Sequence, residues 1–366
     1  FARLAAVRGT EAIQPNDGRF TILREQSEWM SRHAHEIEKF CMFFENAEAA
    51  EAALPRFYAL EGVEVVQGSP DNIEVTAKGV DKGSALQKLA EHLGLAPEQV
   101  IAVGDTDYKF GIESVSKVPT AILTMNQYSP EEVLTKIGAD ATGLPFNSIM
   151  AILLEKDHPS TPLVNAGAIA ACSMIKPIGK PDAKWEAIQG FIEGLCGSSV
   201  EVIDELYKSE TATNFNNKSI AWLLKNYNRI YDDPDLSLDL YTRQCSLGVT
   251  ALQLSIAAGT IANGGVNPVT KKEVFDASLA PKITAMIAAV GFYEHTGDWM
   301  YTSGIPAKTG VGGGVMGVLP GQFGIAAFAP PLDGSGNSVK AQLAIQYIMN
   351  KLELNVFSDN HLIVVD

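Results

Sequence analysis

Cysteine is scarce in this sequence, and the few cysteines are widely spaced. The four are Cys41, Cys172, Cys196 and Cys245, and no two of them form a Cys-x-x-Cys pair. Because structural zinc sites and small disulfide-bonded folds need closely grouped cysteines, both classes are excluded. The spacing instead favours reduced thiols in a cytoplasmic protein, and nothing in the sequence indicates a bound metal or another cofactor.

Long apolar runs and an excess of positive charge are also missing. No run of about 18 apolar residues occurs, so no transmembrane helix is expected, and no signal peptide is visible. The net charge is −15 and the sequence pI is about 4.9. Because nucleic acids and anionic membranes repel an acidic protein, neither is expected as a partner.

The sequence does contain enough apolar material for a sizeable core. Hydrophobic residues make up 46% and charged residues 19% of the 366 residues, which is typical of a globular protein. At about 150 residues per domain, this length indicates two domains. The first part predicts a helical stretch over residues 31–60, a strand over 72–77, a helix over 82–93 and a strand over 100–103, which is an α/β pattern.

Longer helical patterns follow Asp105, separated by loops rich in Gly, Pro and Asn. An apolar, glycine-rich stretch over residues 321–329 predicts a buried strand. Helices predominate, so this part should be a sheet covered by helices. The helices are expected over residues 114–127, 130–136, 166–174, 184–195, 220–226, 252–263 and 338–351.

The sharpest local motif is Ser114-Val115-Ser116-Lys117. On a helix, residues three apart lie on the same face, so the Ser114 hydroxyl and the Lys117 amine could touch. A serine hydroxyl is a weak nucleophile until a base removes its proton. A lysine can act as that base only if burial or a nearby cation lowers its pKa. The motif by itself is a weak signal, because it occurs by chance in many chains and is then a solvated helical turn.

A second motif, Lys308-Thr309-Gly310, opens a glycine-rich run that continues to Gly314. Its lysine offers the second cation, and its glycines allow a close approach of the backbone to a ligand, with free N–H groups for an oxyanion hole. Ser-x-x-Lys followed by Lys-Thr-Gly is typical of serine acyl-enzymes of the penicillin-recognising type. The residues alone leave open whether the two motifs meet.

Several collinear blocks show a wider resemblance. The block over residues 110–117 resembles the nucleophile segment of bacterial serine-dependent glutaminases, and Asn165-Ala166-Gly167-Ala168 resembles their Asn-Ala-Gly-Ala segment. The match spans about 250 residues, from about residue 103 onward. Further blocks with the same resemblance lie at residues 209–223, 241–246, 304–311 and 330–338.

The resemblance implies an α/β (α+β) fold of the β-lactamase/transpeptidase type, with an antiparallel sheet flanked by helices. It implies hydrolysis of L-glutamine to L-glutamate and ammonia, without a cofactor or metal, by a homo-oligomer such as a tetramer. By the same resemblance, Ser114 is the nucleophile and Lys117 is its base. The backbone N–H groups of Ser114 and Val311 would hold the oxyanion.

The remaining site residues also follow from the resemblance. Glu210 would meet the substrate α-ammonium, and Asn165 and Asn217 would bind its polar and carboxylate end. Tyr241 and Tyr293 would line the site, and one of them would relay a proton to the departing ammonia. Taken singly, each has an ordinary structural alternative, such as a solvated glutamate, a helix-capping asparagine or a core tyrosine.

The N-terminal part resembles a different family. Residues 72–105 are similar to the C-terminal part of haloacid-dehalogenase-like (HAD-like) sugar phosphatases of the Cof type, in which a lysine such as Lys82 neutralises phosphate. The Asp-x-Asp nucleophile motif of that family is absent from residues 1–71, and Tyr108 and Lys109 replace residues of its magnesium loop. A Mg-dependent sugar phosphatase is therefore the weaker alternative.

The sequence thus predicts a HAD-like fragment over residues 1–102 joined to a glutaminase domain over 103–366. The glutaminases' Asp-Tyr-Ile-Pro motif, whose tyrosine lines the site, and the strand pair before the nucleophile are absent. Strand 72–77 or strand 100–103 is expected to replace the missing edge of the sheet, since an unpaired edge invites aggregation. A catalytically impaired fusion or binding protein that keeps the glutaminase shape remains an alternative.

Overall fold

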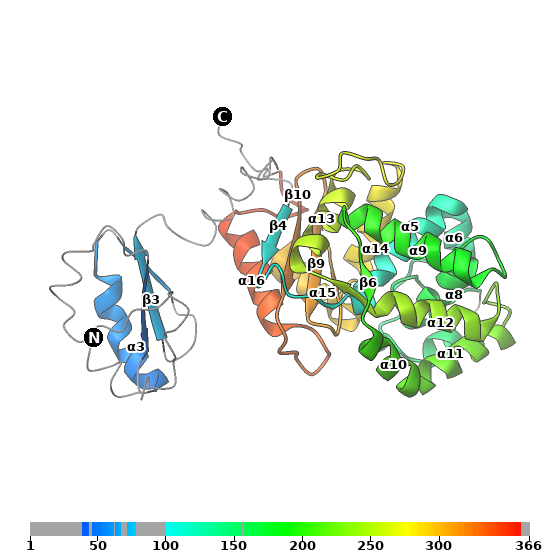
Figure 1. The fold of residues 1–366 in the computed structure, drawn as a ribbon, viewed down its shortest axis with the longest axis horizontal. Coiled ribbons are helices and arrows are strands. Elements are labelled where there is room, and N and C mark those ends of the chain that lie inside the picture. Colours follow the sequence, from blue (N-terminus) through cyan, green and yellow to red (C-terminus); the bar gives the residue numbers. More distant parts are fainter. Residues whose placement is uncertain are drawn as a thin grey trace. The chain divides into compact units, whose positions relative to one another are not determined.

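A computed structural model of the chain divides it into two compact units, Phe1–Leu93 and Gly94–Asp366. Each unit is considered by itself (Figure 1). The helix predicted over residues 82–93 lies outside the part that the structure describes. The structure describes residues 39–43, 46–61, 63–66, 72–77, 100–155 and 157–359.

The described residues of the first unit form a small antiparallel sheet and one helix. Strands β1 (Lys39–Phe43) and β2 (Val63–Val66) flank the central strand β3 (Asn72–Ala77). Helix α3 (Ala47–Tyr58) packs on this sheet, and Ile73 and Val75 are buried with it. The strand predicted over residues 72–77 is confirmed.

A continuous helix over residues 31–60 is a wrong prediction for part of that range. Residues 39–43 form β1, in which Lys39 pairs with Thr76 and Phe43 with Asn72. Pairing with a distant strand overrides the local helical pattern. The helix begins only after Asn46, whose side chain accepts a hydrogen bond from the Ala49 amide at 2.9 Å and so caps α3.

The main sheet of the second unit has the strand order β4-β10-β9-β8. Strands β8 (Ala307–Thr309), β9 (Gly314–Leu319) and β10 (Phe323–Phe328) are antiparallel. Strand β4 (Val100–Val103) pairs with β10 in parallel, with Ala102 opposite Ala326. The edge of the sheet is therefore supplied by residues 100–103, and residues 72–77 belong to the other unit.

Side chains alternate between the two faces of this sheet. Met316 and Ala326 face helix α13 (Ala251–Ala262), whereas Val315 and Ile325 face helix α16 (Val339–Lys351). Because successive residues of a strand point to opposite faces, a strand covered on both sides is apolar throughout. Figure 1 shows the sheet between these helices.

A second small sheet has the strand order β5 (Phe110–Gly111), β7 (Leu247–Val249) and β6 (Glu201–Val202), and most of the remaining described residues of the second unit are helical (Figure 1). The helices predicted from residue 114 onward are confirmed, although their ends differ by a few residues. Three long helices, over residues 204–213, 234–245 and 279–290, had not been predicted. The remaining helices are α5 (Lys117–Gln127), α6 (Pro130–Lys136), α7 (Met150–Leu154), α8 (Asn165–Met174), α9 (Pro181–Cys196), α10 (Asp204–Thr213), α11 (Phe215–Asn226), α12 (Pro234–Cys245), α14 (Leu279–Val290) and α15 (Thr296–Ser303).

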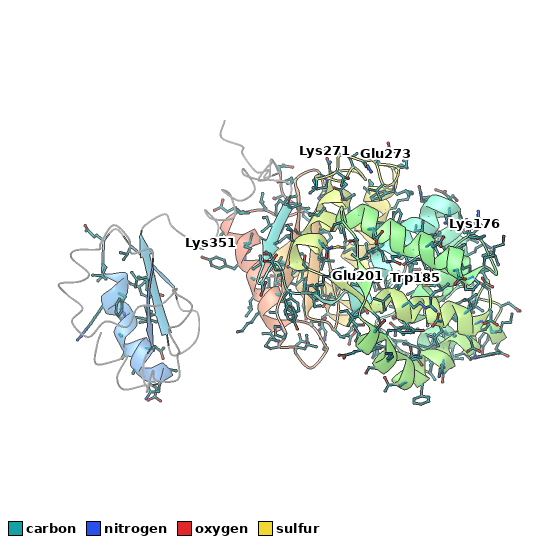
Figure 2. The ribbon with its side chains drawn as sticks, in the orientation of Figure 1. Lys176, Trp185, Glu201, Lys271, Glu273 and Lys351 are labelled. Carbon is teal, nitrogen blue, oxygen red and sulfur yellow. The ribbon has the colours of Figure 1, made fainter. Side chains whose placement is uncertain are left out.

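Charged side chains separate into a surface set and a small buried set. Labelled residues such as Lys176, Glu201 and Lys271 lie at the surface (Figure 2). Three lysines among the residues that the structure describes are instead fully buried, namely Lys117, Lys184 and Lys308. Lys184 forms an ion pair with Asp232, which leaves two buried lysines close to the Ser-x-x-Lys turn. Among the described residues, no helix combines the length and the apolar character needed to cross a bilayer.

The close packing of α13 on the sheet depends on a glycine. A Cβ added to Gly324 would lie 2.0 Å from the Gly259 nitrogen and 2.3 Å from the Ala258 carbonyl carbon. We therefore expect Gly324→Ala to lower the free energy of unfolding by about 2 to 4 kcal/mol, because overpacking a rigid core forces the backbone apart. Urea denaturation of the purified chain measures the change.

Gly190→Ala is the matched control, because Gly190 lies within α9 and a Cβ there meets nothing within 4 Å. That substitution should be neutral or should stabilise the protein by up to about 1 kcal/mol. Equal destabilisation by both substitutions would contradict the packing described for α13.

Candidate active site

The candidate nucleophile lies at the junction between a short strand and a helix. Strand β5 (Phe110–Gly111) pairs with β7 (Leu247–Val249), and the chain then forms the 3₁₀ turn η3 (Glu113–Ser116), which continues directly into α5. The Lys117 Nζ atom donates a hydrogen bond to Ser114 Oγ at 3.0 Å. The turn places Ser114 and Lys117 on one face, as their spacing predicts.

The Lys117 amine is buried and has three oxygen acceptors. Besides Ser114 Oγ, it donates to Asn165 Oδ1 at 2.7 Å and to the Tyr293 hydroxyl at 3.1 Å. The side chain is 1% exposed, and this burial lowers the pKa of Lys117 from 10.5 to about 8. A substantial fraction of the amine is therefore neutral near pH 8 and able to take a proton.

Asn165 connects this amine to the neighbouring helices. Its Oδ1 atom also accepts a hydrogen bond from the Tyr241 hydroxyl at 3.1 Å, and its Nδ2 atom donates to Asn217 Oδ1 at 2.9 Å. Asn165 begins α8, which lies close to the preceding loop because Gly167 has no side chain. A Cβ at Gly167 would lie 1.8 Å from the Thr161 carbonyl oxygen.

The glycine-rich loop after β8 packs against the nucleophile turn. A Cβ at Gly310 would lie 3.0 Å from the Ile112 carbonyl oxygen, and one at Gly312 would lie 2.2 Å from the Gly111 carbonyl oxygen. The two motifs that the sequence left unconnected are therefore neighbours. Only glycine permits this approach of one backbone to another.

Lys308 reaches the same cluster from β8. Its Nζ atom donates to the Thr309 carbonyl oxygen at 2.7 Å and lies 4.0 Å from the centre of the Tyr293 ring. Burial, and then the charge of Lys117, hold the pKa of Lys308 well below its usual value. Two buried ammonium groups side by side are costly, so this arrangement favours neutral amines.

Two backbone amides at the site lack acceptors. In the part of the chain that the structure describes, neither the Ser114 N–H nor the Val311 N–H donates to a backbone or side-chain atom. Val311 is 44% exposed, whereas Ser114 is 8% exposed. The first amide lies at the start of η3 and the second in the loop packed against it, which is where oxyanion donors are required.

Three further residues belong to the cluster although no motif singled them out. The Phe146 ring lies 4.8 Å from the Tyr293 ring and 5.7 Å from Lys117 Nζ. The Cys245 Sγ atom lies 3.6 Å from Ser116 Oγ. Glu113 is 8% exposed, and its position between the apolar residue Ile112 and the candidate nucleophile Ser114 was the available signal.

Glu210 is less closely connected than the other predicted site residues. It lies on α10, is partly exposed, and has no hydrogen bond or ion pair among the described residues. Its charge nevertheless acts on Glu113, whose pKa rises to about 7, first through burial and then through Glu210. Glu113 and Tyr293 both have positive φ angles, 49° and 55°, which is uncommon for such residues.

Asp105, one of the residues that carried the phosphatase resemblance, has hydrogen bonds that stabilise the local backbone. The Asp105 carboxylate accepts hydrogen bonds from the Asp107 amide at 3.0 Å and the Tyr108 amide at 3.1 Å, which closes a turn. Within the described ranges, no three His, Cys, Asp or Glu residues gather as a metal site would require. Lys82 lies outside these ranges.

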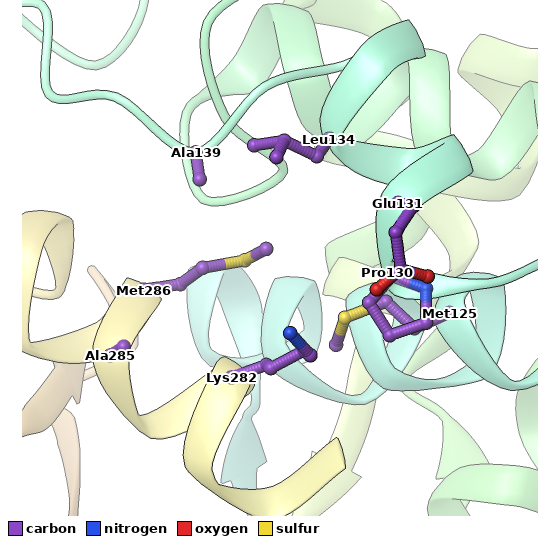
Figure 3. Close-up of a pocket in the computed structure, with 8 residues that line it drawn as sticks. All are labelled: Met125, Pro130, Glu131, Leu134, Ala139, Lys282, Ala285 and Met286. Atoms are coloured by element: carbon purple, nitrogen blue, oxygen red, sulfur yellow. The ribbon is translucent and has the colours of Figure 1, made fainter. Parts of the chain in front are cut away.

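A pocket of about 280 Å³ lies elsewhere, between α5, α6 and α14 (Figure 3). Its walls are mostly apolar and include Met125 of α5, Leu134 of α6 and Met286 of α14. None of the residues of the Ser114–Lys117 cluster lines it, so it does not serve the chemistry of that cluster.

A family model described as glutaminase matches residues 84–357. The chain belongs to the glutaminase family. The match begins before residue 103, where the resemblance in the sequence blocks starts, and it covers the nucleophile turn, the asparagine hub at Asn165 and the glycine-rich loop. The fold shared with solved glutaminases is the β-lactamase-like one, with β4 as a parallel edge strand on an otherwise antiparallel sheet.

Relatives and solved structures agree with this assignment. A glutaminase of Bacteroides thetaiotaomicron is 85% identical over 268 residues, which cover 73% of this chain and 84% of that protein. A glutaminase of Mycobacterium ulcerans is 46% identical over 260 residues, covering 71% and 81% of the two chains. The solved structure of a probable glutaminase, ybaS, has a TM-score of 0.69 and 40% identity, with coverage of 76% and 99%.

A second family model, described as haloacid dehalogenase-like hydrolase, matches residues 9–108. It overlaps the glutaminase match over residues 84–108. Strand β4 lies inside this overlap. The same four residues thus belong to both matches and form the edge of the glutaminase sheet.

The neutral state of Lys117 depends on its uncharged acceptor, Asn165. Asn165→Asp would place a carboxylate beside the amine and should raise the pKa of Lys117 by at least about 1 unit, because an opposite charge favours the ammonium form. The pH dependence of ammonia release from L-glutamine should move upward by the same amount. Asn350→Asp, an exposed position on α16, should leave the profile in place, and an unshifted profile for Asn165→Asp would contradict the assignment.

Proposed function

We propose that the second unit hydrolyses the side-chain amide of L-glutamine through an acyl-enzyme formed on Ser114. The observation that supports this mechanism best is the 3.0 Å hydrogen bond between the buried Lys117 amine and the Ser114 hydroxyl. Membership of the glutaminase family indicates the substrate. The cluster around Ser114 contains a candidate nucleophile, a candidate base and two free backbone amides. Nothing in this scheme needs a metal or another cofactor.

In the first step, neutral Lys117 takes the proton of Ser114 while Oγ bonds to the amide carbon. The Ser114 and Val311 amides stabilise the negative charge that develops on the carbonyl oxygen. The C–N bond then breaks, and the nitrogen leaves as ammonia with a proton from Lys117, relayed by Tyr293 or Tyr241. Water, activated by the same amine, hydrolyses the ester to L-glutamate and restores Ser114.

The amino-acid end of the substrate needs one carboxylate and several donors. We assign Glu210 to the α-ammonium, and Asn165 and Asn217 to the polar and carboxylate end. Tyr241 and Tyr293 line the space between the two ends. The hydrogen bonds that join Asn165 to Tyr241 and Asn217 hold these groups in place in support of that assignment.

The wider organisation of the chain follows the same proposal. Residues 1–102 would be a HAD-like fragment and residues 103–366 the glutaminase domain, which the overlap of the two family matches supports. A homo-oligomer such as a tetramer is proposed on the family pattern, and large exposed apolar side chains such as Phe215 and Leu154 could serve such contacts. The buried, unpaired thiols of Cys172, Cys196 and Cys245 suit a cytoplasmic location.

The direct test is ammonia release from L-glutamine by the purified chain. Ser114→Ala should lower turnover by at least about a thousandfold, because no other group takes over the nucleophile's role. Ser116→Ala is the matched control, since its hydroxyl donates to the Glu113 carbonyl at 2.6 Å and lies 3.6 Å from Cys245 Sγ, without a hydrogen bond to Ser114 or Lys117 among the described residues; it should keep turnover within about tenfold.

Other outcomes of this test would favour the alternatives. Binding of L-glutamine without turnover by the unchanged chain would favour the catalytically impaired fusion, which lacks the family's Asp-Tyr-Ile-Pro segment. Magnesium-dependent release of phosphate from a sugar phosphate would favour the phosphatase.

The pH profile tests the base. Lys117 acts only when neutral, and its pKa is about 8, so kcat/KM should rise by up to about tenfold per pH unit below pH 8 and level off above it. The rate increases with pH because the neutral fraction of the Lys117 amine increases as the pH rises. Steady-state kinetics between pH 6 and pH 10 give the profile, and a rate that falls between pH 6 and pH 8 would contradict the role of Lys117.

A further inference from the structure

The mechanism above leaves one buried acid unused. Glu113 lies directly before the nucleophile and is 8% exposed. In the described part of the chain, its carboxylate has neither a hydrogen bond nor an ion pair. Its oxygens are not among the fully buried polar atoms that lack a partner, so they remain accessible although the residue is mostly buried. A ligand that enters the site can therefore reach this carboxylate, and an ionised acid in such a place favours a cationic partner.

The side chain of Glu113 is fixed in direction by its surroundings. Its Cβ and Cγ atoms lie 3.4 Å and 3.3 Å from the positions that a Cβ would take on Gly310 and Gly312. A Cβ added to Gly111 would lie 3.5 Å from the Glu113 Oε1 atom. The carboxylate is therefore held between the nucleophile turn and the loop that contains Val311. The left-handed backbone at Glu113, with a φ of 49°, is part of this placement.

Helix α10 brings a second carboxylate to the same place. A Cβ added to Gly111 would lie only 2.4 Å from the Leu206 Cδ2 atom of α10. This helix therefore packs on the strand that leads to Glu113. Glu210 is one helical turn beyond Leu206 and on the same face. Consistent with that placement, Glu210 is the charge that raises the pKa of Glu113 most.

The other groups that act on the Glu113 charge come from three elements. Lys117 of α5 lowers its pKa, whereas burial and Glu210 of α10 raise it, with the result near 7. The charge of Glu113 in turn raises the pKa values of Tyr241 and Cys245 on α12 and of Tyr293 on η4 (Tyr293–His295). Of these groups, Lys117 is the single cation, and its hydrogen bonds go to Ser114, Asn165 and Tyr293.

We propose that Glu113 and Glu210 together bind the α-ammonium group of the substrate, and that Glu113 gives up a proton to solvent when this group binds. The proposal rests on the proposed function, which puts an amino acid in this site. In the empty site the proton on Glu113 removes the repulsion between two nearby carboxylates. In the filled site the ammonium replaces that proton as the positive partner of the pair.

The exchange is balanced in charge and in protons. A protonated Glu113 and an ammonium ion enter the step; an ionised Glu113, bound to the ammonium, and one proton in solvent leave it. Binding of an amino acid through this pair must therefore weaken as the pH falls below about 7. A dicarboxylic acid without the ammonium group cannot drive the exchange. The pair thus selects α-amino acids over their des-amino analogues.

Calorimetry with two product-like ligands tests the exchange in the unchanged, full-length chain. L-glutamate and glutarate are titrated separately at pH 6.5, each in two buffers that differ in ionisation enthalpy, which gives the protons released on binding. We expect L-glutamate to release about 0.5 to 0.8 proton more than glutarate. Both ligands carry two carboxylates, so any proton uptake by Lys117 in response to these groups is the same for both and drops out of the difference. Equal proton release with both ligands would overturn the proposal.

Variants then assign the proton to its group. Glu113→Gln should abolish the extra proton release and weaken L-glutamate binding about 10- to 100-fold, with glutarate binding kept within about threefold. Glu113→Asp, which keeps the charge, should restore part of the affinity and of the proton release. Glu205→Gln, an exposed acid on α10, is the matched control and should change neither. A purely structural role of Glu113 would weaken both ligands equally, which would overturn the proposal.

The test also separates this proposal from the proposed function. If the unchanged chain binds L-glutamate and releases ammonia from L-glutamine, but the extra proton is missing, only the role of Glu113 fails. If the chain binds neither ligand and releases no ammonia, both proposals fail. Thermal unfolding of each variant shows whether it folds. If Glu113→Gln does not fold, the comparison of L-glutamate with glutarate in the unchanged chain still tests the proposal.

Discussion

The site depends on one interaction, the hydrogen bond from the buried Lys117 amine to the Ser114 hydroxyl. Burying an amine disfavours its charged form, and in the proposed mechanism this shift lets Lys117 act as a base near neutral pH. The same burial would be destabilising without partners. The oxygens of Ser114, Asn165 and Tyr293 supply them without adding a negative charge that would restore the usual pKa.

Much of the surrounding fold serves to keep this amine dry and its partners in place. Glycine makes the closest approaches possible: Gly167 brings the start of α8 against the preceding loop, and Gly310 and Gly312 bring the second motif against the nucleophile turn. Behind the turn, β4 supplies the edge of the sheet in parallel to β10. One of the two strands that the sequence offered for this place thus pairs with β10, and β4 is the outermost described strand of the sheet.

The sequence predicted the elements whose signal is local. The strands over residues 72–77 and 100–103, and helices such as α6 and α16, have apolar periodicity and clear end signals, and the structure confirms them. Prediction from the sequence was wrong where pairing with a distant strand determines the structure. Residues 39–43 have a helical pattern but form β1, because they pair with β3. The choice between two candidate edge strands was likewise open, because only the folded sheet determines which strand pairs with β10.

The site was predictable in its parts but not in its connections. Spacing alone placed Ser114 beside Lys117, and resemblance supplied Asn165, Asn217, Tyr241, Tyr293, Glu210 and Val311. Neither indicated that Asn165 is the hub that joins Lys117 to Tyr241 and Asn217, nor that Glu113 is a buried acid without a partner, because burial is a property of the whole fold.

Direct titration of the Lys117 amine tests this account most directly. In protein labelled with ¹³C at lysine Cε, the resonance that is missing from the Lys117→Arg variant belongs to this side chain. Its chemical shift, followed from pH 6 to pH 11, should show a midpoint at about 8. A midpoint near the ordinary lysine value of 10.5 would mean that the amine is charged at neutral pH, and it would contradict the role of Lys117 as the base for Ser114.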